Sequence, residues 1–172
     1  MTAPHDITIF TIGHSNHGLD HFLALLETAG ITALADVRSK PASRFCPHFN
    51  RENLKAALIA HGISYVYLGD ALGGKPADPA LYTNGNPDYQ KIAASAAFKG
   101  GLARLMAGAK TYRIAMMCAE RDPRQCHRTH LITPALVAER VAITHILSDG
   151  GLLPHSELAA EMAGGQFDLL SI

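Results

Sequence analysis

The densest group of chemically reactive side chains lies in the segment MMCAERDPRQCHR, which spans residues 116–128. It combines two thiols, a carboxylate, an imidazole and a guanidinium, which belong to Cys118, Cys126, Glu120, His127 and Arg128. Because a polar or charged group is costly to bury without a partner, such groups seldom gather directly after an apolar run for packing reasons alone. The segment therefore predicts a functional site.

A reactive cysteine is the first chemistry that these residues suggest. Cys126 lies near the start of a predicted helix, where the helix dipole favours a thiolate, and Arg128 adds a positive charge nearby. Cys118 is the candidate nucleophile, and Glu120 or His127 could serve as general acid or base. This interpretation predicts an enzyme-like site, but the residues alone do not identify a reaction.

A metal site is a second interpretation, because thiols and imidazoles are ligands for soft and borderline metal ions. The residues that could supply them are Cys118, Cys126, His127 and His14. The spacing lacks the paired C-x-x-C knuckles of a zinc ribbon, and two adjacent helix residues such as Cys126 and His127 point in different directions. We therefore assign no metal ligand and name no cofactor from the pattern.

Two further interpretations of the same segment stay open. Cys118 and Arg124 have the C-x5-R spacing of a phosphatase-like or rhodanese-like anion loop, but that loop would contain two acidic residues, a proline and no glycine. Alternatively, Cys118 is a small buried thiol that only packs, and Glu120 forms a structural ion pair with Arg128.

The elements that must position these groups alternate between strand and helix. Short apolar, β-branched runs predict strands over 7–12, 33–37, 64–68, 112–117 and 142–147. Helical spacing predicts helices over 19–29, 51–61, 88–107, 125–138 and 154–163, the third with a break near Gly100-Gly101. This order predicts a single α/β domain over residues 1–172, a three-layer sandwich with a mainly parallel sheet of about five strands. It is Rossmann-like without the G-x-G-x-x-G dinucleotide fingerprint.

Ligands of such sheets bind beyond the carboxyl ends of the strands, and polar residues follow several of the predicted strands here. We expect them to converge in one cleft. The candidate catalytic residues are Cys118, Glu120, Asp36, Cys126 and His127, and the candidate substrate-binding residues are His14, Ser15, Arg38, Ser39 and Arg128. Two structural alternatives remain, since Asp36 could pair with an arginine at this edge and Ser15 could cap the first helix.

The segment 69–87 is rich in glycine, proline and polar residues and is too long for a plain connection. Loops of this length are often lids or binding loops. Its Gly73-Gly74-Lys75 sequence lacks the other residues of a phosphate-binding Walker motif, so a flexible turn is favoured there.

Four separated motifs, TIGHS, DVRSKPASR, YVYLGDALGG and MCAERDPRQCHR, also carry a resemblance to a known family. In this order, over roughly residues 9–147, they resemble the domain of unknown function 488 family. The resemblance implies a compact α/β domain. It implies no established reaction, so the expected function depends on the residues themselves.

Composition limits the classes of partner. Apolar residues make up 48% and charged residues 17%, which is typical of a globular chain. The 15 basic and 15 acidic residues balance, so no general attraction to nucleic acid or membranes is expected. There is no apolar run of the ~20 residues that a membrane helix needs, no recognisable signal peptide and no disulfide-like cysteine pattern, and we expect a cytoplasmic protein.

The expected function follows from these points. The chain is predicted to act at the C-terminal edge of the sheet on a small polar or anionic ligand, with a nucleotide or a nucleic-acid fragment among the candidates. The alternative is a non-catalytic binding module that senses a metal, a redox state or a nucleotide. The oligomeric state is left open.

Overall fold

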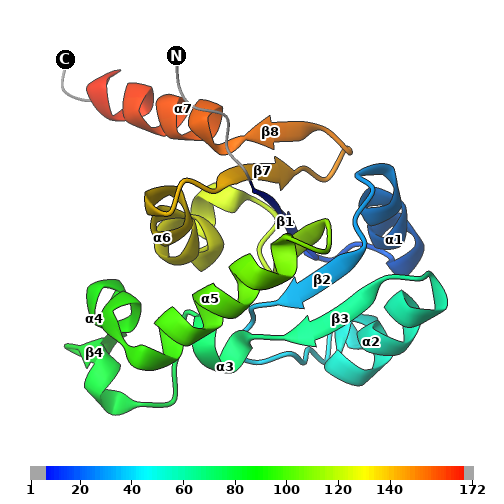
Figure 1. Ribbon diagram of the computed structural model, residues 1–172, viewed down its shortest axis with the longest axis horizontal. Helices are drawn as coiled ribbons and strands as arrows, with labels where there is room; N and C mark the ends of the chain where they lie inside the picture. Colours follow the sequence, from blue (N-terminus) through cyan, green and yellow to red (C-terminus); the bar gives the residue numbers. More distant parts are fainter. Residues whose placement is uncertain (1–6, 169–172) are drawn as a thin grey trace.

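The computed structural model describes residues 7–168, and a sheet of six strands crosses the centre of this part of the chain (Figure 1). The strand order is β3-β2-β6-β1-β7-β8. The strands are β1 (Thr8–Gly13), β2 (Ala33–Asp36), β3 (Ser64–Tyr67), β6 (Ile114–Cys118), β7 (Ala142–Ile146) and β8 (Leu152–Pro154). Neighbouring strands are parallel except β7 and β8, which form an antiparallel pair.

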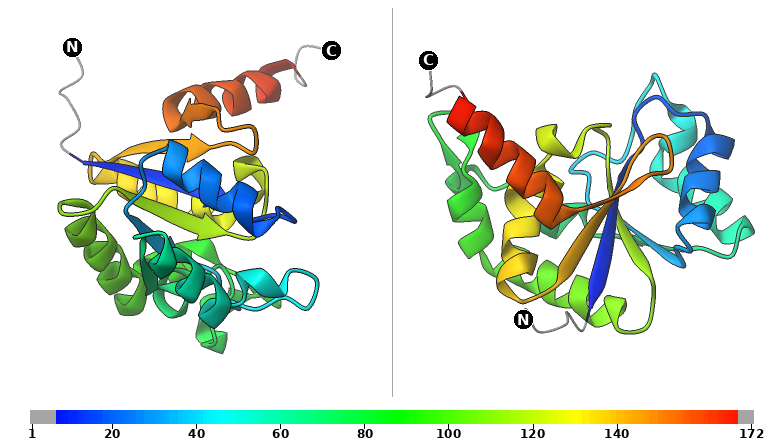
Figure 2. Two further views of the ribbon diagram at one scale, coloured as in Figure 1. Left: turned by 90° about the vertical axis from the view of Figure 1, so that its right-hand side faces the viewer. Right: turned by 90° about the horizontal axis from the view of Figure 1, so that it is seen from above.

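Helices cover both faces of the sheet (Figure 2). One face carries α1 (Leu19–Thr28) and α2 (Arg51–Ala60), and the other carries α3 (Gly69–Leu72), α4 (Tyr89–Ala94), α5 (Ala96–Ala109) and α6 (Thr133–Ala138). The last helix, α7 (His155–Asp168), packs against β7 and β8. The predicted three-layer α/β class is confirmed, with about one strand more than expected.

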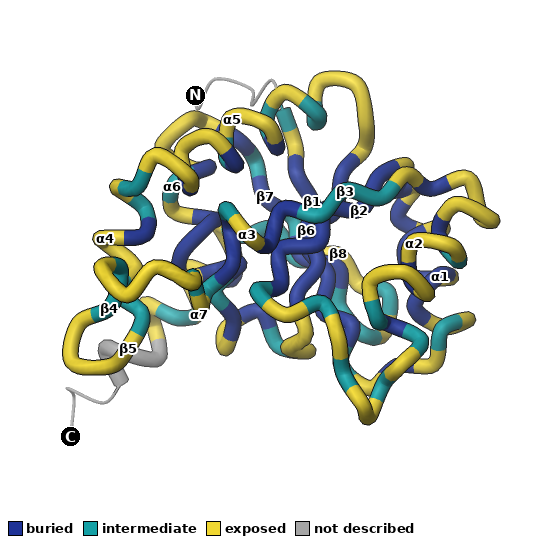
Figure 3. Tube along the Cα trace, turned by 90° about the horizontal axis from the view of Figure 1, so that it is seen from below, coloured by how far each residue is buried: buried dark blue, intermediate teal, exposed yellow. Residues whose placement is uncertain are grey.

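Successive side chains of a strand point to opposite faces of the sheet, which explains why there are two apolar layers. In β1, Ile9 packs with the α3–α6 layer, whereas Phe10 and Ile12 pack with α1 and α2. Strands buried on both faces read as continuous apolar runs, which is why they are visible in the sequence. Figure 3 shows the result, with the central strands buried and the outer surfaces of the helices exposed.

Two features of the fold differ from the sequence prediction. The expected helix over 88–107 is broken at Ser95, not at the glycine pair, because Ser95 is extended and its hydroxyl accepts a hydrogen bond from the backbone N–H of Phe98 at the start of α5. The expected helix over 125–138 is three short pieces, which are the 3₁₀ turn η3 (Pro123–Gln125), the π-helical turn η4 (Arg128–Ile132) and α6.

The long segment 69–87 is largely ordered into short elements. It contains α3, the 3₁₀ turn η2 (Pro79–Leu81) and a small hairpin of β4 (Tyr82–Thr83) and β5 (Asn86–Pro87). Along the part of the chain that the structure describes, no helix is both long and apolar enough to cross a bilayer.

Parallel pairing brings the predicted polar strand ends together. Gly13 at the end of β1 is in register with Cys118 at the end of β6, and Asp36 at the end of β2 is in register with Met117. The residues that follow these three strands therefore emerge at one edge of the sheet.

Candidate functional site

A cavity of about 420 Å³ opens at this edge, beyond β2 and β6. Five of the candidate residues line it, namely Arg38, Ser39, Cys118, Glu120 and His127. The other lining residues are Lys40, Gly74, Lys75, Pro87, Tyr89, Ala119 and Gln125. Of the remaining candidates, Asp36 and His14 bond to Arg38, Cys126 contacts His127, and the backbone of Arg128 bonds to Cys126, whereas Ser15 does not line the cavity.

Asp36 is completely buried, and both oxygens of its carboxylate accept hydrogen bonds from Arg38. Arg38 donates from Nε to Oδ1 at 2.9 Å and from Nη2 to Oδ2 at 2.7 Å, a bidentate pair. Tyr65 donates to the same Oδ2 at 2.7 Å, and burial followed by this bond raises the pKa of Tyr65, so its hydroxyl remains a donor. The contacts support a positioning role for Asp36, and its expected catalytic role stays a prediction.

His14 supports Arg38 from the side of β1. Its ring stacks on Phe49 with centroids 4.6 Å apart, and burial lowers its pKa to about 4. The ring is therefore neutral near pH 7. Since the Ser15 carbonyl can only accept, Nδ1 carries the proton and donates to it at 2.7 Å, which leaves Nε2 to accept from Nη1 of Arg38 at 3.3 Å.

Ser15 neither lines the cavity nor caps the first helix. Its backbone has a φ of +47°, and its Oγ accepts a hydrogen bond from Nε of Arg121 at 3.2 Å. Gly18 occupies the N-cap of α1 and makes no side-chain cap bond, so the prediction of a Ser15 cap is wrong.

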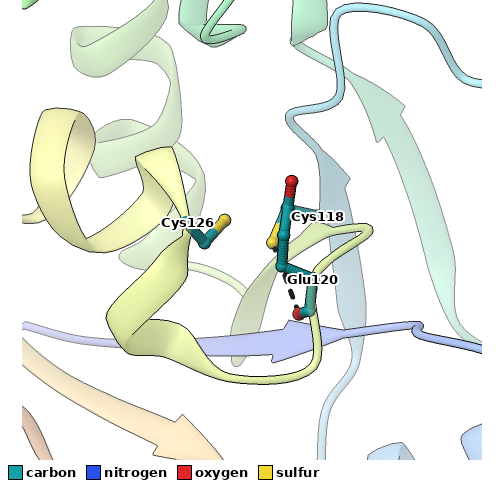
Figure 4. Close-up of side chains that lie close together, drawn as sticks. All are labelled: Cys118, Glu120 and Cys126. Atoms are coloured by element: carbon teal, nitrogen blue, oxygen red, sulfur yellow. Dashed lines mark hydrogen bonds between the residues drawn. The ribbon is translucent and has the colours of Figure 1, made fainter.

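The two thiols and Glu120 form a compact cluster (Figure 4). The Sγ atoms of Cys118 and Cys126 and a carboxylate oxygen of Glu120 all lie within 4.8 Å of one another. Both cysteines are buried, and Glu120 is the exposed member. Cys118 comes from the last position of β6, and Cys126 follows the η3 turn.

The electrostatics of the cluster separate the roles of its members. A hydrogen bond with Cys118, and then burial, raise the pKa of Cys126, which argues against the thiolate at Cys126 that a helix dipole would favour. Partial burial raises the pKa of Glu120, but bonds from the Cys118 thiol, its own backbone N–H and the Cys126 thiol outweigh it and lower the pKa overall. Glu120 is therefore an ionised carboxylate near pH 7.

His127 is a neutral residue that is fixed from both sides. Its Nε2 donates to the carbonyl oxygen of Val37 at 3.0 Å, so Nδ1 is unprotonated and lies 3.7 Å from Sγ of Cys126. Burial lowers the pKa of His127, which keeps the ring uncharged.

Arg128 is a buried cation with little compensation. It is 1% exposed, and its Nη2 donates to the carbonyl oxygen of Arg121 at 3.2 Å. Its Nε and Nη1 are buried and have no hydrogen-bond partner among the described residues. No ion pair joins Glu120 to Arg128 in the described part of the chain, so the structural ion pair considered from the sequence is not formed.

The phosphatase-like arrangement is also not formed. Arg124 turns away from Cys118 and forms ion pairs with Asp122, at 3.2 Å, and with Glu161 on α7. The C-x5-R spacing therefore does not bring a guanidinium over the thiol, and the hypothesis of an anion loop around Cys118 is wrong for this conformation.

The residues that the sequence reasoning missed come mainly from the segment 69–87. Lys75 donates its backbone N–H to Oγ of Ser39 at 2.9 Å, which ties this segment to the end of β2. A Cβ on Gly73 would lie 2.3 Å from the same Oγ, and one on Gly74 would lie 3.0 Å from Cβ of His127. The two glycines therefore allow the backbone of this segment to lie directly against Ser39 and His127. The length and the glycine-rich composition of the segment were the signals for its role.

Gly13 packs directly against the backbone of the loop that carries Glu120. An added Cβ would lie 1.7 Å from the carbonyl oxygen of Glu120, so Gly13→Ala is expected to displace the loop and to lower the free energy of unfolding by about 1–3 kcal/mol. Thermal and urea unfolding measure this loss.

The matched control for that prediction is Gly100→Ala. A Cβ at Gly100 meets nothing within 4 Å, so this change in α5 is expected to raise stability by about 0.5–1 kcal/mol through helix propensity. Equal effects of the two substitutions would contradict the predicted clash at Gly13.

The covered, mainly parallel sheet defines an α/β fold, and the polar cavity lies at the carboxyl edge, where ligands of this class usually bind. The family described as Domain of unknown function DUF488 matches residues 18–133, so the chain belongs to this family. Neither a curated protein nor a solved structure matches the chain.

Proposed function

We propose that this chain is an enzyme that acts in the 420 Å³ cavity on a small polar ligand with an anionic group. One observation carries the proposal: lysines and an ionised carboxylate line the same hollow as a thiol. Pockets with a few convergent polar groups, and with groups whose pKa is perturbed, are the usual setting of active sites.

The charge of the lining favours an anionic group on the ligand. Arg38 is already neutralised by Asp36, so the charges that remain free to act on a ligand are those of Lys40, Lys75 and Glu120. The two lysines are exposed and can reach a phosphate or carboxylate as point charges. A nucleotide or a short nucleic-acid fragment is one ligand class with such a group, and Tyr89 offers a ring against which a base could stack.

The reaction is best placed at Cys118 and Glu120, because these residues combine chemical reactivity with a position in the cavity wall, where Cys118 is buried and Glu120 is exposed. They could act directly, as nucleophile and general acid or base, or they could hold an ion that acts on the ligand. Cys126 lies next to both residues, and His127 contacts Cys126.

A binding experiment tests the proposal with adenosine monophosphate, inorganic phosphate and uncharged adenosine as probes. The monophosphate is expected to bind more tightly than adenosine, and Lys75→Ala is expected to weaken its binding by about fivefold, the effect of one exposed charge. Isothermal titration calorimetry at low salt measures both.

Lys55→Ala is the control, because it removes the same charge from α2, outside the cavity lining. It is expected to leave the affinity unchanged. The proposal is overturned if neither anionic probe binds, or if the two lysine variants lose affinity equally.

A further inference from the structure

Three metal-ligating side chains already stand close together at the edge of the cavity. We infer that Cys118, Cys126 and Glu120 bind a divalent metal ion of the zinc type, and that this ion is the reactive centre of the proposed enzyme. Thiolate sulfur and carboxylate oxygen are accepted zinc ligands. The metal site stands independently, but its role as the reactive centre, and the position of the ligand in the same cavity, rest on the proposed function.

The distances suit a site that closes slightly around an ion. Zinc–sulfur bonds of about 2.3 Å and zinc–oxygen bonds of about 2.1 Å in a tetrahedron separate the ligand atoms by roughly 3.5–3.8 Å. The three ligand atoms here lie within 4.8 Å of one another, so inward shifts of about 1 Å or less would suffice. Glu120 is exposed and can make the largest of these movements.

One contact of Cys126 suits a metal-ligating sulfur. The backbone N–H of Arg128 donates to its Sγ at 3.4 Å, the kind of outer hydrogen bond that orients and stabilises a metal ligand. This contact is made by the backbone of a buried turn, so it is fixed by the fold.

The buried guanidinium of Arg128 matches the charge of such a centre. An ion of charge +2 with two thiolates and one carboxylate carries a net charge of −1, which the nearby buried +1 of Arg128 would balance. Loading exchanges two thiol protons for the ion, so the total charge of this region does not change. Arg128 is 1% exposed and has two nitrogens without a partner among the described residues, and an adjacent anionic centre would account for its burial.

The ion would be open toward the ligand. Cys118 and Glu120 line the cavity and Cys126 does not, so three ligands enclose the ion from the protein side and leave its remaining position facing the hollow. Three protein ligands with one open position are characteristic of catalytic zinc sites, whereas structural sites are closed by four. An oxygen of the anionic ligand or a water molecule would take this position.

The imidazoles that the sequence pattern suggested as ligands are committed elsewhere. Nε2 of His127 bonds to the Val37 carbonyl, and Nδ1 of the same ring lies against Sγ of Cys126. Both ring nitrogens of His14 are occupied, by the Ser15 carbonyl and by Arg38. The carboxylate of Glu120 therefore replaces the histidines in the proposed ligand set.

Cobalt(II) is the test probe, because it reports thiolate ligation by its charge-transfer absorption. We expect the reduced full-length chain to bind one equivalent of Co²⁺ with thiolate-to-cobalt bands, and Zn²⁺ to displace it. Cys118→Ser and Cys126→Ser are each expected to lower the Zn²⁺ affinity by more than about 100-fold, beyond the loss typical of outer-shell partners. Glu120→Gln is expected to weaken Zn²⁺ binding while leaving the thiolate bands in place.

The third cysteine of the chain is the matched control. Cys46 is partly buried and lies outside the cluster, so Cys46→Ser is expected to bind both ions like the unmodified chain. Thermal unfolding of every variant shows whether it is folded. Because Cys118 is in the core, Cys118→Ala serves as a second variant should the serine variant not fold.

The outcomes separate this inference from the proposed function. Failure to bind either ion, or equal binding by the Cys46, Cys118 and Cys126 variants, overturns the metal site. Rapid formation of a Cys118–Cys126 disulfide without metal uptake also overturns it in favour of a redox pair. If adenosine monophosphate still binds, the proposed function survives these results, whereas metal uptake without any anion binding sinks the proposed function alone.

Discussion

Asp36→Asn is expected to lower the free energy of unfolding by about 3–5 kcal/mol, the range seen when one partner of a buried ion pair is removed. Asp36 is completely buried, and Arg38 is 5% exposed. The asparagine would leave the almost fully buried guanidinium without a counter-charge. It would also point amide hydrogens at the nitrogens of Arg38, which can only donate.

Urea unfolding at pH 7 measures this loss, and two other substitutions calibrate it. Tyr65→Phe removes one neutral donor from the same carboxylate and should cost about 1 kcal/mol. Glu52→Gln removes a charge from an exposed pair with Arg51, 3.8 Å apart, and should change stability by less than about 0.5 kcal/mol. A loss at Asp36 no larger than that at Glu52 would contradict the assigned role.

Arg128→Met has the opposite expected sign. This substitution should raise the free energy of unfolding of the metal-free protein by about 1–4 kcal/mol, the range found when buried charges are replaced by apolar side chains of similar volume. Arg128 is buried with two unpaired nitrogens, so methionine would remove an uncompensated charge while filling most of the same space. The lost bond to the Arg121 carbonyl offsets only part of this gain.

The same measurement with Arg104→Met is the control for an arginine that is exposed on α5, where a change within about 0.5 kcal/mol is expected. Arg128→Met should also weaken Zn²⁺ binding, because the balancing charge is gone. Stability gained together with binding lost is characteristic of a functional residue, since such sites retain strained or unpaired groups. If Arg128→Met instead lowered the free energy of unfolding, Arg128 would have a stabilising, structural role.

The two arginines illustrate how far sequence reasoning reaches. Both follow strands or turns at the predicted edge of the sheet, and both are predicted to bind a ligand. Their partners differ because Arg38 lies two residues from Asp36 on the same strand end, whereas Arg128 is carried under the loop after β6 by a π-helical turn. Local spacing indicates the first arrangement, and no local pattern indicates the second.

The strands that the sequence predicted are the ones with the strongest local signal. Five apolar, β-branched runs match β1, β2, β3, β6 and β7 because each is long enough to show its composition. The strand of the six-stranded sheet that was missed, β8, has three residues at an antiparallel edge after a glycine pair, and its pairing with β7 is visible only once the chain has turned back.

The glycines also show that local sequence patterns do not predict contacts between elements. The pair Gly100-Gly101 suggested a helix break, yet α5 continues through both residues. Gly101 is needed for another reason, since a Cβ there would lie 2.6 Å from Ala71 of α3. Its small size serves contact between helices, a property of packing that no propensity scale contains. The break instead falls at Ser95, whose capping bond is a local signal that could have been read.

The sequence by itself determined the α/β class. It also indicated the carboxyl edge of the sheet as the place of a candidate site, with Cys118 and Glu120 as candidate reactive residues, because strand periodicity and strand-end chemistry are local. Only the tertiary structure decided which of these groups meet. It brought Lys75 to Ser39, turned Arg124 toward Glu161, and brought a carboxylate oxygen of Glu120 within 4.8 Å of the two thiols. The reason is that contacts between distant residues depend on how complete helices and strands pack, which no single segment encodes.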